Sequence, residues 1–140
     1  MSTGPKQFGK YELWERLGHS SMTEVWKALD AQSHRHLAIK LLHPNLQTIP
    51  DFVSHFENEM RMIASLHHPN IIQIHDFQII SPPQSDSTIA YIAMDYVEGP
   101  TLADYIRTTS QAGKFPSALD IVHLFTFISI AIDYALSLIH

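Results

Sequence analysis

The sequence predicts an α+β fold: a five-stranded antiparallel sheet with one packed helix, followed by two further helices. Two patterns predict it. Between residues 11 and 94, short segments alternate apolar and polar residues, which is typical of half-buried strands, and one longer segment has apolar residues at helical spacing. After residue 100 the spacing is helical throughout, with an interrupting loop before Pro116. The change of period divides the chain into a sheet-rich part and a helical part.

The first three expected strands form a meander. In the third, the period of two places Ala38 and Lys40 on one face of the sheet and Leu37 and Ile39 on the other. Lys40 therefore shares its face with a small apolar residue. The three strands are expected at residues 11–17, 23–29 and 37–42, with a turn at 18–22 and a hairpin loop at 30–35.

A helix is expected next, with Asp51 as its N-cap and its end near Leu66. Glu59 lies three residues after Phe56 and four before Ile63, so it falls on the apolar face of this helix. A carboxylate on a buried face needs a partner, because an unpaired buried charge is costly. The alternative is an exposed glutamate at the edge of the apolar stripe. The apolar face comprises Phe52, Phe56, Ile63 and Leu66.

Two more strands, at residues 71–77 and 88–94, flank a Pro- and Ser-rich loop at 81–87. A short helix is expected at 101–107. Pro116 and Ser117 start a last helix over residues 118–138, with Asp120 contributing to its N-terminal cap.

The last helix is apolar on most of its circumference. From residue 121 to residue 140 the only formally charged residue is Asp133. A helix of this kind is either buried in protein or inserted in a membrane, and about 20 apolar residues suffice to cross a bilayer. His123, Thr126 and Ser129 interrupt the apolar run, which disfavours the membrane. An uncovered helix of this composition is expected to associate with a partner or with itself.

Composition excludes several classes of function. The 140 residues are 45% hydrophobic and carry a net charge of −5, so a buried core is expected and a nucleic-acid surface is not. Without cysteine there is no disulfide framework. The ten histidines include two close pairs, but neither has the spacing of a metal site. Residues 1–10 are expected to be a disordered leader without the apolar core of a signal peptide, which indicates the cytoplasm.

Five signals occur in order along the chain, each weak by itself. The signals are Leu-Gly-His-Ser-Ser-Met-Thr-Glu-Val-Trp-Lys-Ala at 17–28, Leu-Ala-Ile-Lys at 37–40, Glu59, His-Pro-Asn-Ile-Ile at 68–72 and Tyr-Ile-Ala-Met-Asp-Tyr-Val-Glu-Gly at 91–99. Together they resemble the small, ATP-binding lobe of a eukaryotic-type serine/threonine protein kinase of the bacterial kind. The small lobe would cover residues 11–98, and residues 99–140 would begin the large lobe.

The resemblance implies a role for each site residue. Lys40 would contact the α- and β-phosphates of ATP, and Glu59 would hold Lys40 in place. The rest of the nucleotide site would comprise a hairpin over the phosphates (Leu17, Gly18, Ser20, Thr23), two residues that sandwich the adenine (Val25, Ala38), Met94 at the back, and the backbone of Asp95 and Val97 at the adenine edge.

The chain departs from the family pattern in two ways. Of three loop glycines only Gly18 is present, with Ser20 and Thr23 in the other places, so ATP binding is expected to be weak. The catalytic aspartate loop, the Asp-Phe-Gly magnesium ligand and the activation segment are missing, although His140 coincides with the first residue of the family's His-Arg-Asp. The resemblance therefore implies a kinase domain truncated before its catalytic loop and inactive alone, without the family's magnesium ligands.

Two other hypotheses stay open. The chain could be a pseudokinase-like interaction module that binds nucleotide weakly or not at all and docks a partner through its last helix. It could also be a membrane-associated protein anchored by residues 119–139. For the kinase hypothesis, the expected partners are ATP and a protein substrate or the missing C-terminal half of the domain. Binding of ATP analogues separates the kinase and module hypotheses, and detergent dependence tests the membrane hypothesis.

Overall fold

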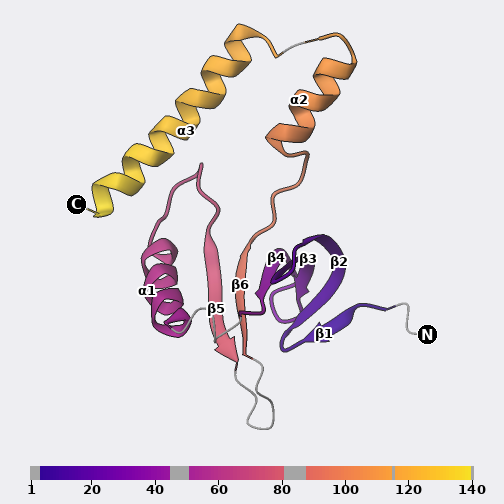
Figure 1. Cartoon of the computed structure of the whole chain (residues 1–140), viewed down its shortest axis with the longest axis vertical. Helices are drawn as coiled ribbons and strands as arrows, with labels where there is room; N and C mark the ends of the chain where they lie inside the picture. Colours follow the sequence, from indigo (N-terminus) through magenta and orange to yellow (C-terminus); the bar gives the residue numbers. More distant parts are fainter. Residues whose placement is uncertain (1–3, 45–50, 81–87, 115, 140) are drawn as a thin grey trace. The chain divides into compact units, whose positions relative to one another are not determined.

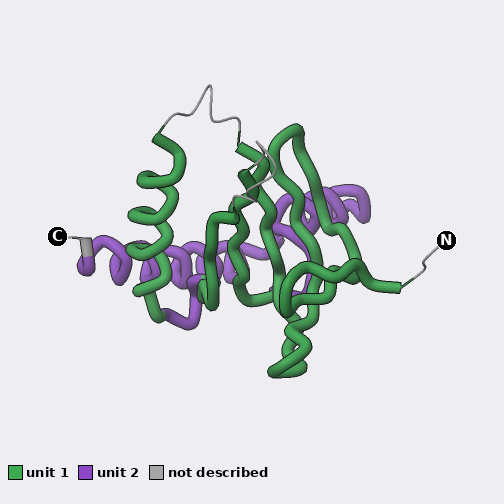
Figure 2. Tube along the Cα trace, turned by 90° about the horizontal axis from the view of Figure 1, so that it is seen from below, with its two compact units in different colours: residues 1–67, 72–96 green, residues 68–71, 97–140 purple. Residues whose placement is uncertain are grey.

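The structure is a computed structural model that describes residues 4–44, 51–80, 88–114 and 116–139 (Figure 1). The chain divides into two compact units, which Figure 2 colours separately. The first unit comprises residues 1–67 and 72–96 and contains the sheet. The second comprises residues 68–71 and 97–140 and contains two helices.

The first unit is built on a curled sheet of six antiparallel strands in the order β1-β2-β3-β4-β6-β5. The α+β class and the antiparallel meander agree with the sequence prediction, but the strand count is six instead of five. The strands are β1 (Lys6–Phe8), β2 (Tyr11–His19), β3 (Thr23–Asp30), β4 (Arg35–Leu42), β5 (Ile74–Ile80) and β6 (Ile89–Asp95).

The additional strand is β1, which lies inside the segment expected to be a disordered leader. Gly9 has a φ of +57°, a conformation that glycine adopts without strain, and it turns the chain so that Phe8 pairs with Tyr11. The Phe8 ring then packs edge-on against Tyr91, with 5.4 Å between ring centroids. The expectation of disorder is therefore wrong for residues 6–8, because this hairpin buries an aromatic side chain. Residues 1–3 lie outside the described part of the chain.

The helix α1 (Phe52–Ala64) packs against β5 in the first unit. Its buried side chains are Phe56 and Met60, and the Phe56 ring meets the Phe77 ring at 6.2 Å. Ile63, expected on the buried face, is 38% exposed. Asp51 is the N-cap residue, as expected, but its side chain makes no capping hydrogen bond. The buried stripe follows positions 52, 56 and 60, one residue away from Glu59.

The second unit consists of α2 (Leu102–Gln111), α3 (Ala118–Ile139) and the segment 68–71. Thr101 caps α2, since its hydroxyl accepts the backbone N–H of Asp104 at 3.0 Å. Ser117 caps α3 in the same way, accepting the N–H of Asp120 at 3.1 Å. The side-chain amide of Asn70 donates to the carbonyl of Phe127 at 3.1 Å, which attaches segment 68–71 to α3.

The helix α3 is exposed along almost its whole length. Ala131 is its one buried residue within the described part, and large apolar side chains such as Phe125 and Phe127 are more than half exposed. Among the described residues, α3 is the one helix long and apolar enough over Ala118–Leu138 to cross a membrane, with a mean hydropathy of 1.8. The similarity of α3 to a membrane-spanning helix rests on length and composition alone, and no other feature of the described residues points to a bilayer.

Candidate functional site

The register of the sheet brings together residues that the sequence prediction assigned to one nucleotide site. Val25 on β3 lies opposite Lys40 on β4, and Gly18 on β2 lies opposite Val25. Ala38 on β4 lies opposite Met94 on β6. Directly opposed residues in antiparallel strands project from the same face, so these five residues share one face of the sheet. The same face packs against α1 further along, through Ile92 and Ala90.

The burial of these residues suits the apolar end of a nucleotide site with one cation beside it. Ala38 is 8% exposed, and Val25 and Met94 are half-buried. Lys40 is half-buried as well, and its stem rises between Ala38 and Leu42 on the same face of β4. An ammonium group next to small apolar side chains can neutralise phosphate charge while the neighbouring surface contacts a base.

Lys40 and Glu59 form no ion pair within the described part of the chain, where four such pairs occur. Glu59 is exposed on α1, because the helix buries Phe56 and Met60 and turns the intervening position outward. The expected location of Glu59 on the buried face is therefore wrong. A Lys40–Glu59 pair in the presence of nucleotide stays a prediction.

The hairpin between β2 and β3 is closed by the two residues that replace glycines. The Ser20 and Thr23 hydroxyls are 2.7 Å apart, and the Ser20 N–H donates to the Thr23 carbonyl at 2.8 Å. Leu17 is the extra residue of a β-bulge between Arg16 and Gly18, and it is 44% exposed. The hairpin tip is thus held by its own side chains. The two hydroxyls bond to each other, although they could otherwise contact phosphate.

A charged cluster at the base of this hairpin was not found by sequence reasoning. Glu24 lies 3.2 Å from His43 and 3.6 Å from Arg16, and the His43 N–H donates to the Met22 carbonyl at 2.7 Å. The hydrogen bond from His43 is the main reason that the pKa of Glu24 lies below its usual value. The three side chains come from β2, β3 and the end of β4, so only the register of the sheet shows that they meet.

Asp95, expected to contribute only its backbone, is also held through its side chain. Its carboxylate accepts from the His75 ring at 2.5 Å and from the Gln73 N–H at 3.0 Å. Its own N–H donates to the Gln73 carbonyl at 3.0 Å. The His75 hydrogen bond is the main cause that lowers the pKa of Asp95. Val97, the other expected adenine contact, belongs to the second unit and is 65% exposed.

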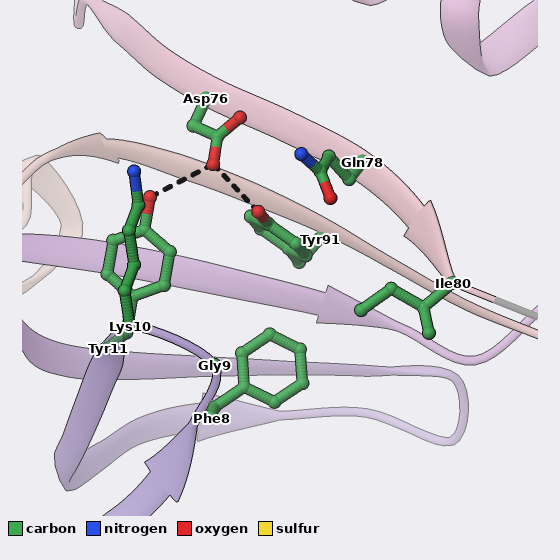
Figure 3. A pocket seen from close by; sticks show the side chains of 8 residues that line it. All are labelled: Phe8, Gly9, Lys10, Tyr11, Asp76, Gln78, Ile80 and Tyr91. Carbon is green, nitrogen blue, oxygen red and sulfur yellow. Dashed lines mark hydrogen bonds between the residues drawn. The ribbon is translucent and has the colours of Figure 1, made fainter. Parts of the chain in front are cut away.

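A separate pocket of about 380 Å³ lies on another part of the first unit, where Tyr11 and Tyr91 both donate hydrogen bonds to Asp76 (Figure 3). Burial and the negative charge of Asp76 raise the pKa of both tyrosines, so their hydroxyls stay protonated donors. Lys10 completes one side, with its ammonium 5.4 Å from the centroid of the Tyr11 ring. None of the residues assigned to nucleotide binding lines this pocket.

Among the described residues, no three His, Cys, Asp or Glu side chains are grouped so that they could hold a metal ion.

Comparison with known proteins finds a family model described as the protein kinase domain, which matches residues 11–139. The serine/threonine-protein kinase PknB of Mycobacterium leprae is 37% identical over 108 residues, covering 77% of this chain and 17% of that protein. The probable serine/threonine-protein kinase PknB of Bifidobacterium longum is 34% identical over 71% of this chain and 15% of its own length. The crystal structure of the PknI kinase domain of Mycobacterium tuberculosis, 27% identical, has a TM-score of 0.72 over 96% of this chain and 51% of that one.

Proposed function

This chain belongs to the protein kinase family, and we propose that its first unit binds ATP on the sheet face that carries Val25, Ala38, Lys40 and Met94. The observation that carries the proposal is the register, which places Val25 opposite Lys40 and Ala38 opposite Met94. Val25 and Ala38 would contact the faces of the adenine. Lys40 would pair with the α- and β-phosphates, and Met94 would close the back of the site.

The hairpin over the phosphates is the weakest part of this site. Glycines there would let backbone N–H groups approach phosphate oxygens closely. Here Ser20 and Thr23 are bonded to one another instead. We expect the hairpin to contribute little to affinity, so that binding depends mainly on Lys40 and on the adenine contacts.

The activity proposed for the whole protein is phosphoryl transfer from ATP to serine or threonine of a protein substrate. The chain spans 17% of its Mycobacterium leprae relative and about half of the PknI kinase domain, so this activity rests on family membership. The 140 residues contain neither His-Arg-Asp nor Asp-Phe-Gly, which hold the catalytic aspartate and a magnesium ligand in the family. Magnesium is expected to act only together with groups that these residues do not supply.

The test is nucleotide binding by the 140-residue chain, measured by calorimetry with a non-hydrolysable ATP analogue. Lys40→Ala should weaken binding by at least about tenfold, because it removes a charge-assisted contact to phosphate worth about 1.5–3 kcal/mol. Lys10→Ala, which removes an exposed lysine from the turn between β1 and β2, is the matched control and should bind like the unsubstituted chain. Equal affinities for all three proteins would contradict the proposal.

A second candidate function is an interaction module, and the exposed apolar surface of α3 is the observation that favours it. In this case α3 would dock a protein partner and the sheet face would hold no nucleotide. This candidate would be favoured over the first if the unsubstituted chain bound no nucleotide and associated through α3.

A further inference from the structure

We propose that His75 and Lys27 are positioning residues that hold Asp95 and Tyr96 in the place where the chain meets the adenine edge. The inference rests on the proposed function, because it assigns to these two side chains a share of the nucleotide affinity. Neither residue belongs to the set that the kinase resemblance identifies. Both act through a neighbour and need no contact with the nucleotide.

The β-ladder itself ends at this point of the sheet. The pair Leu37–Asp95 is the last one between β4 and β6, and Ile74–Met94 is the last one between β5 and β6. Beyond Asp95, the backbone has no regular strand partner to fix its position. One backbone hydrogen bond continues the contact, from the Asp95 N–H to the Gln73 carbonyl at 3.0 Å. Side chains must therefore supply the remaining restraint.

His75 supplies it on the β5 side. A register shift between Ile74 and Asp76 makes His75 the extra residue of a β-bulge, and a bulge changes the direction of a side chain. The His75 ring meets one carboxylate oxygen of Asp95 at 2.5 Å, while the Gln73 N–H meets the other oxygen at 3.0 Å. One oxygen of Asp95 is thereby held by His75 on β5 and the other by Gln73, the residue that precedes β5, so the side chain cannot turn without breaking a hydrogen bond.

Lys27 supplies it on the β3 side. Its ammonium lies 4.8 Å from the centroid of the Tyr96 ring, within the range of a cation–π interaction. Lys27 lies opposite Ala38, on the sheet face proposed for the nucleotide, and Leu37 on the neighbouring register position lies opposite Asp95. Asp95 is therefore held from the β5 side by His75, and Tyr96 is held from the β3 side by Lys27.

The consequence for binding follows from hydrogen-bond geometry. The adenine edge bonds to backbone groups that must be in fixed positions. Any conformational freedom that this backbone has in the free protein is therefore lost when the base binds. A segment that is already restrained loses less entropy. Releasing His75 or Lys27 should therefore weaken binding of the base without changing the phosphate contacts of Lys40.

The experiment measures binding of adenosine and of a non-hydrolysable ATP analogue to the full 140-residue chain. Adenosine has no phosphate, so the hairpin over the phosphates, with its cluster of Glu24 and His43, does not affect the measured affinity. His75→Ala and Lys27→Ala should each weaken adenosine by about threefold to tenfold, the range of a lost hydrogen bond or cation–π contact. The matched controls are His55→Ala on α1 and Lys10→Ala, which removes a comparable lysine–tyrosine contact at the turn between β1 and β2.

Two further readouts separate positioning from a general loss of structure. His75→Gln keeps a neutral donor, so it should retain most of the adenosine affinity that His75→Ala loses. A Lys27→Ala/Tyr96→Ala double variant should bind no more weakly than Tyr96→Ala alone.

The possible results are distinct. Failure of the unsubstituted chain to bind either probe overturns the proposed function and this inference with it. Binding that responds to Lys40→Ala, but is the same in the His75, Lys27 and control variants, overturns the inference alone. Adenosine binding by His75→Gln that is as weak as that of His75→Ala also overturns it. Weaker adenosine binding in the two alanine variants, with the controls unchanged, supports it.

Discussion

The hydroxyl of Tyr11 lies 3.1 Å from a carboxylate oxygen of Asp76, and this hydrogen bond joins two strands that are far apart in the order of the sheet. Tyr11 begins β2, next to one edge, and Asp76 lies on β5, which forms the opposite edge. Tyr91 on β6 donates to the same oxygen at 2.7 Å. The curl of the sheet is therefore closed by one carboxylate with two buried tyrosine donors, across the core that contains Leu13 and Ile39.

Asp76→Ala should lower the free energy of unfolding by about 2–4 kcal/mol, because it leaves two buried hydroxyls without an acceptor. Tyr91→Phe removes one donor and should cost less, about 1 kcal/mol. Urea unfolding followed by circular dichroism measures both. Glu57→Ala, at an exposed position on α1 of the same unit, serves as the control. An Asp76→Ala protein as stable as the Glu57→Ala protein would show that the tyrosines find other partners.

Ser20→Gly/Thr23→Gly should tighten binding of ATP analogues by about threefold to tenfold. The double substitution removes the hydroxyl contact at the hairpin tip and gives the backbone access to phosphate. The free protein should become less stable, because the hairpin loses a hydrogen bond and gains freedom in the unfolded chain. Calorimetry measures the affinity, and thermal unfolding measures the stability. Weaker binding in the double variant would mean that the hydroxyls themselves contact phosphate.

The 140-residue chain should transfer no phosphate to itself or to a generic protein substrate. Phosphoryl transfer needs a positioned base and metal ligands, which contribute a large part of the rate, and these residues contain neither family motif. Incorporation of labelled phosphate is the measurement. Incorporation that disappears in Lys40→Ala would contradict the prediction, since a contaminating kinase would not respond to that substitution.

Glu24 should make stability depend on pH in the acid range. Its pKa is lowered in the folded state from 4.5, mainly by the hydrogen bond to His43, so its contribution is present above pH 4.5 and is lost as the pH falls through the folded pKa. Glu24→Gln should reduce the loss of stability between neutral pH and that range. Thermal unfolding at a series of pH values tests it, with Glu57→Gln on α1 as the control. Parallel profiles for the unsubstituted chain and Glu24→Gln would argue against a role for Glu24.

The chain should self-associate through residues 119–139. Exposed side chains of α3 such as Phe127 (55% exposed) and Ile130 (48% exposed) forgo most of the stabilisation of about 1.5–3 kcal/mol that burial gives each large apolar residue. Changing Phe127 and Ile130 to serine should reduce association, measured by sedimentation velocity without detergent. Val53→Ser, at an exposed apolar position on α1, is the control. A monomer at tens of micromolar, about the range where exposed apolar surface aggregates, would contradict this prediction.

Local patterns in the sequence were sufficient for most of the fold. Alternation located all five expected strands within a few residues, and helical spacing located the three helices. The hairpin of β1 was missed because three residues are too short for a period of two to be recognised, and because the turn depends on one glycine. The expected burial of Ile63 was wrong because a shift of one position along a helix turns a side chain by about 100°.

The same division holds for the proposed nucleotide site. Its residue types and their order, including Lys40, Ala38 and Met94, were predicted from motifs that lie within single strands. The contacts of His75 with Asp95 and of His43 with Glu24 were not predicted, because each joins residues about twenty positions apart through the register of neighbouring strands. No local pattern carries that information, since bulges at Leu17 and His75 shift the register.

By itself, the sequence determined the family, the antiparallel meander, the face of β4 that carries Lys40, and the apolar character of the last helix. These features depend on residue type and on spacing within one element. The tertiary structure alone decided that Glu59 is exposed, that Ser20 and Thr23 close the hairpin on each other, and that one carboxylate closes the curled sheet. These features depend on which side chains meet across strands and helices, and that is set by register, bulges and burial over the whole unit.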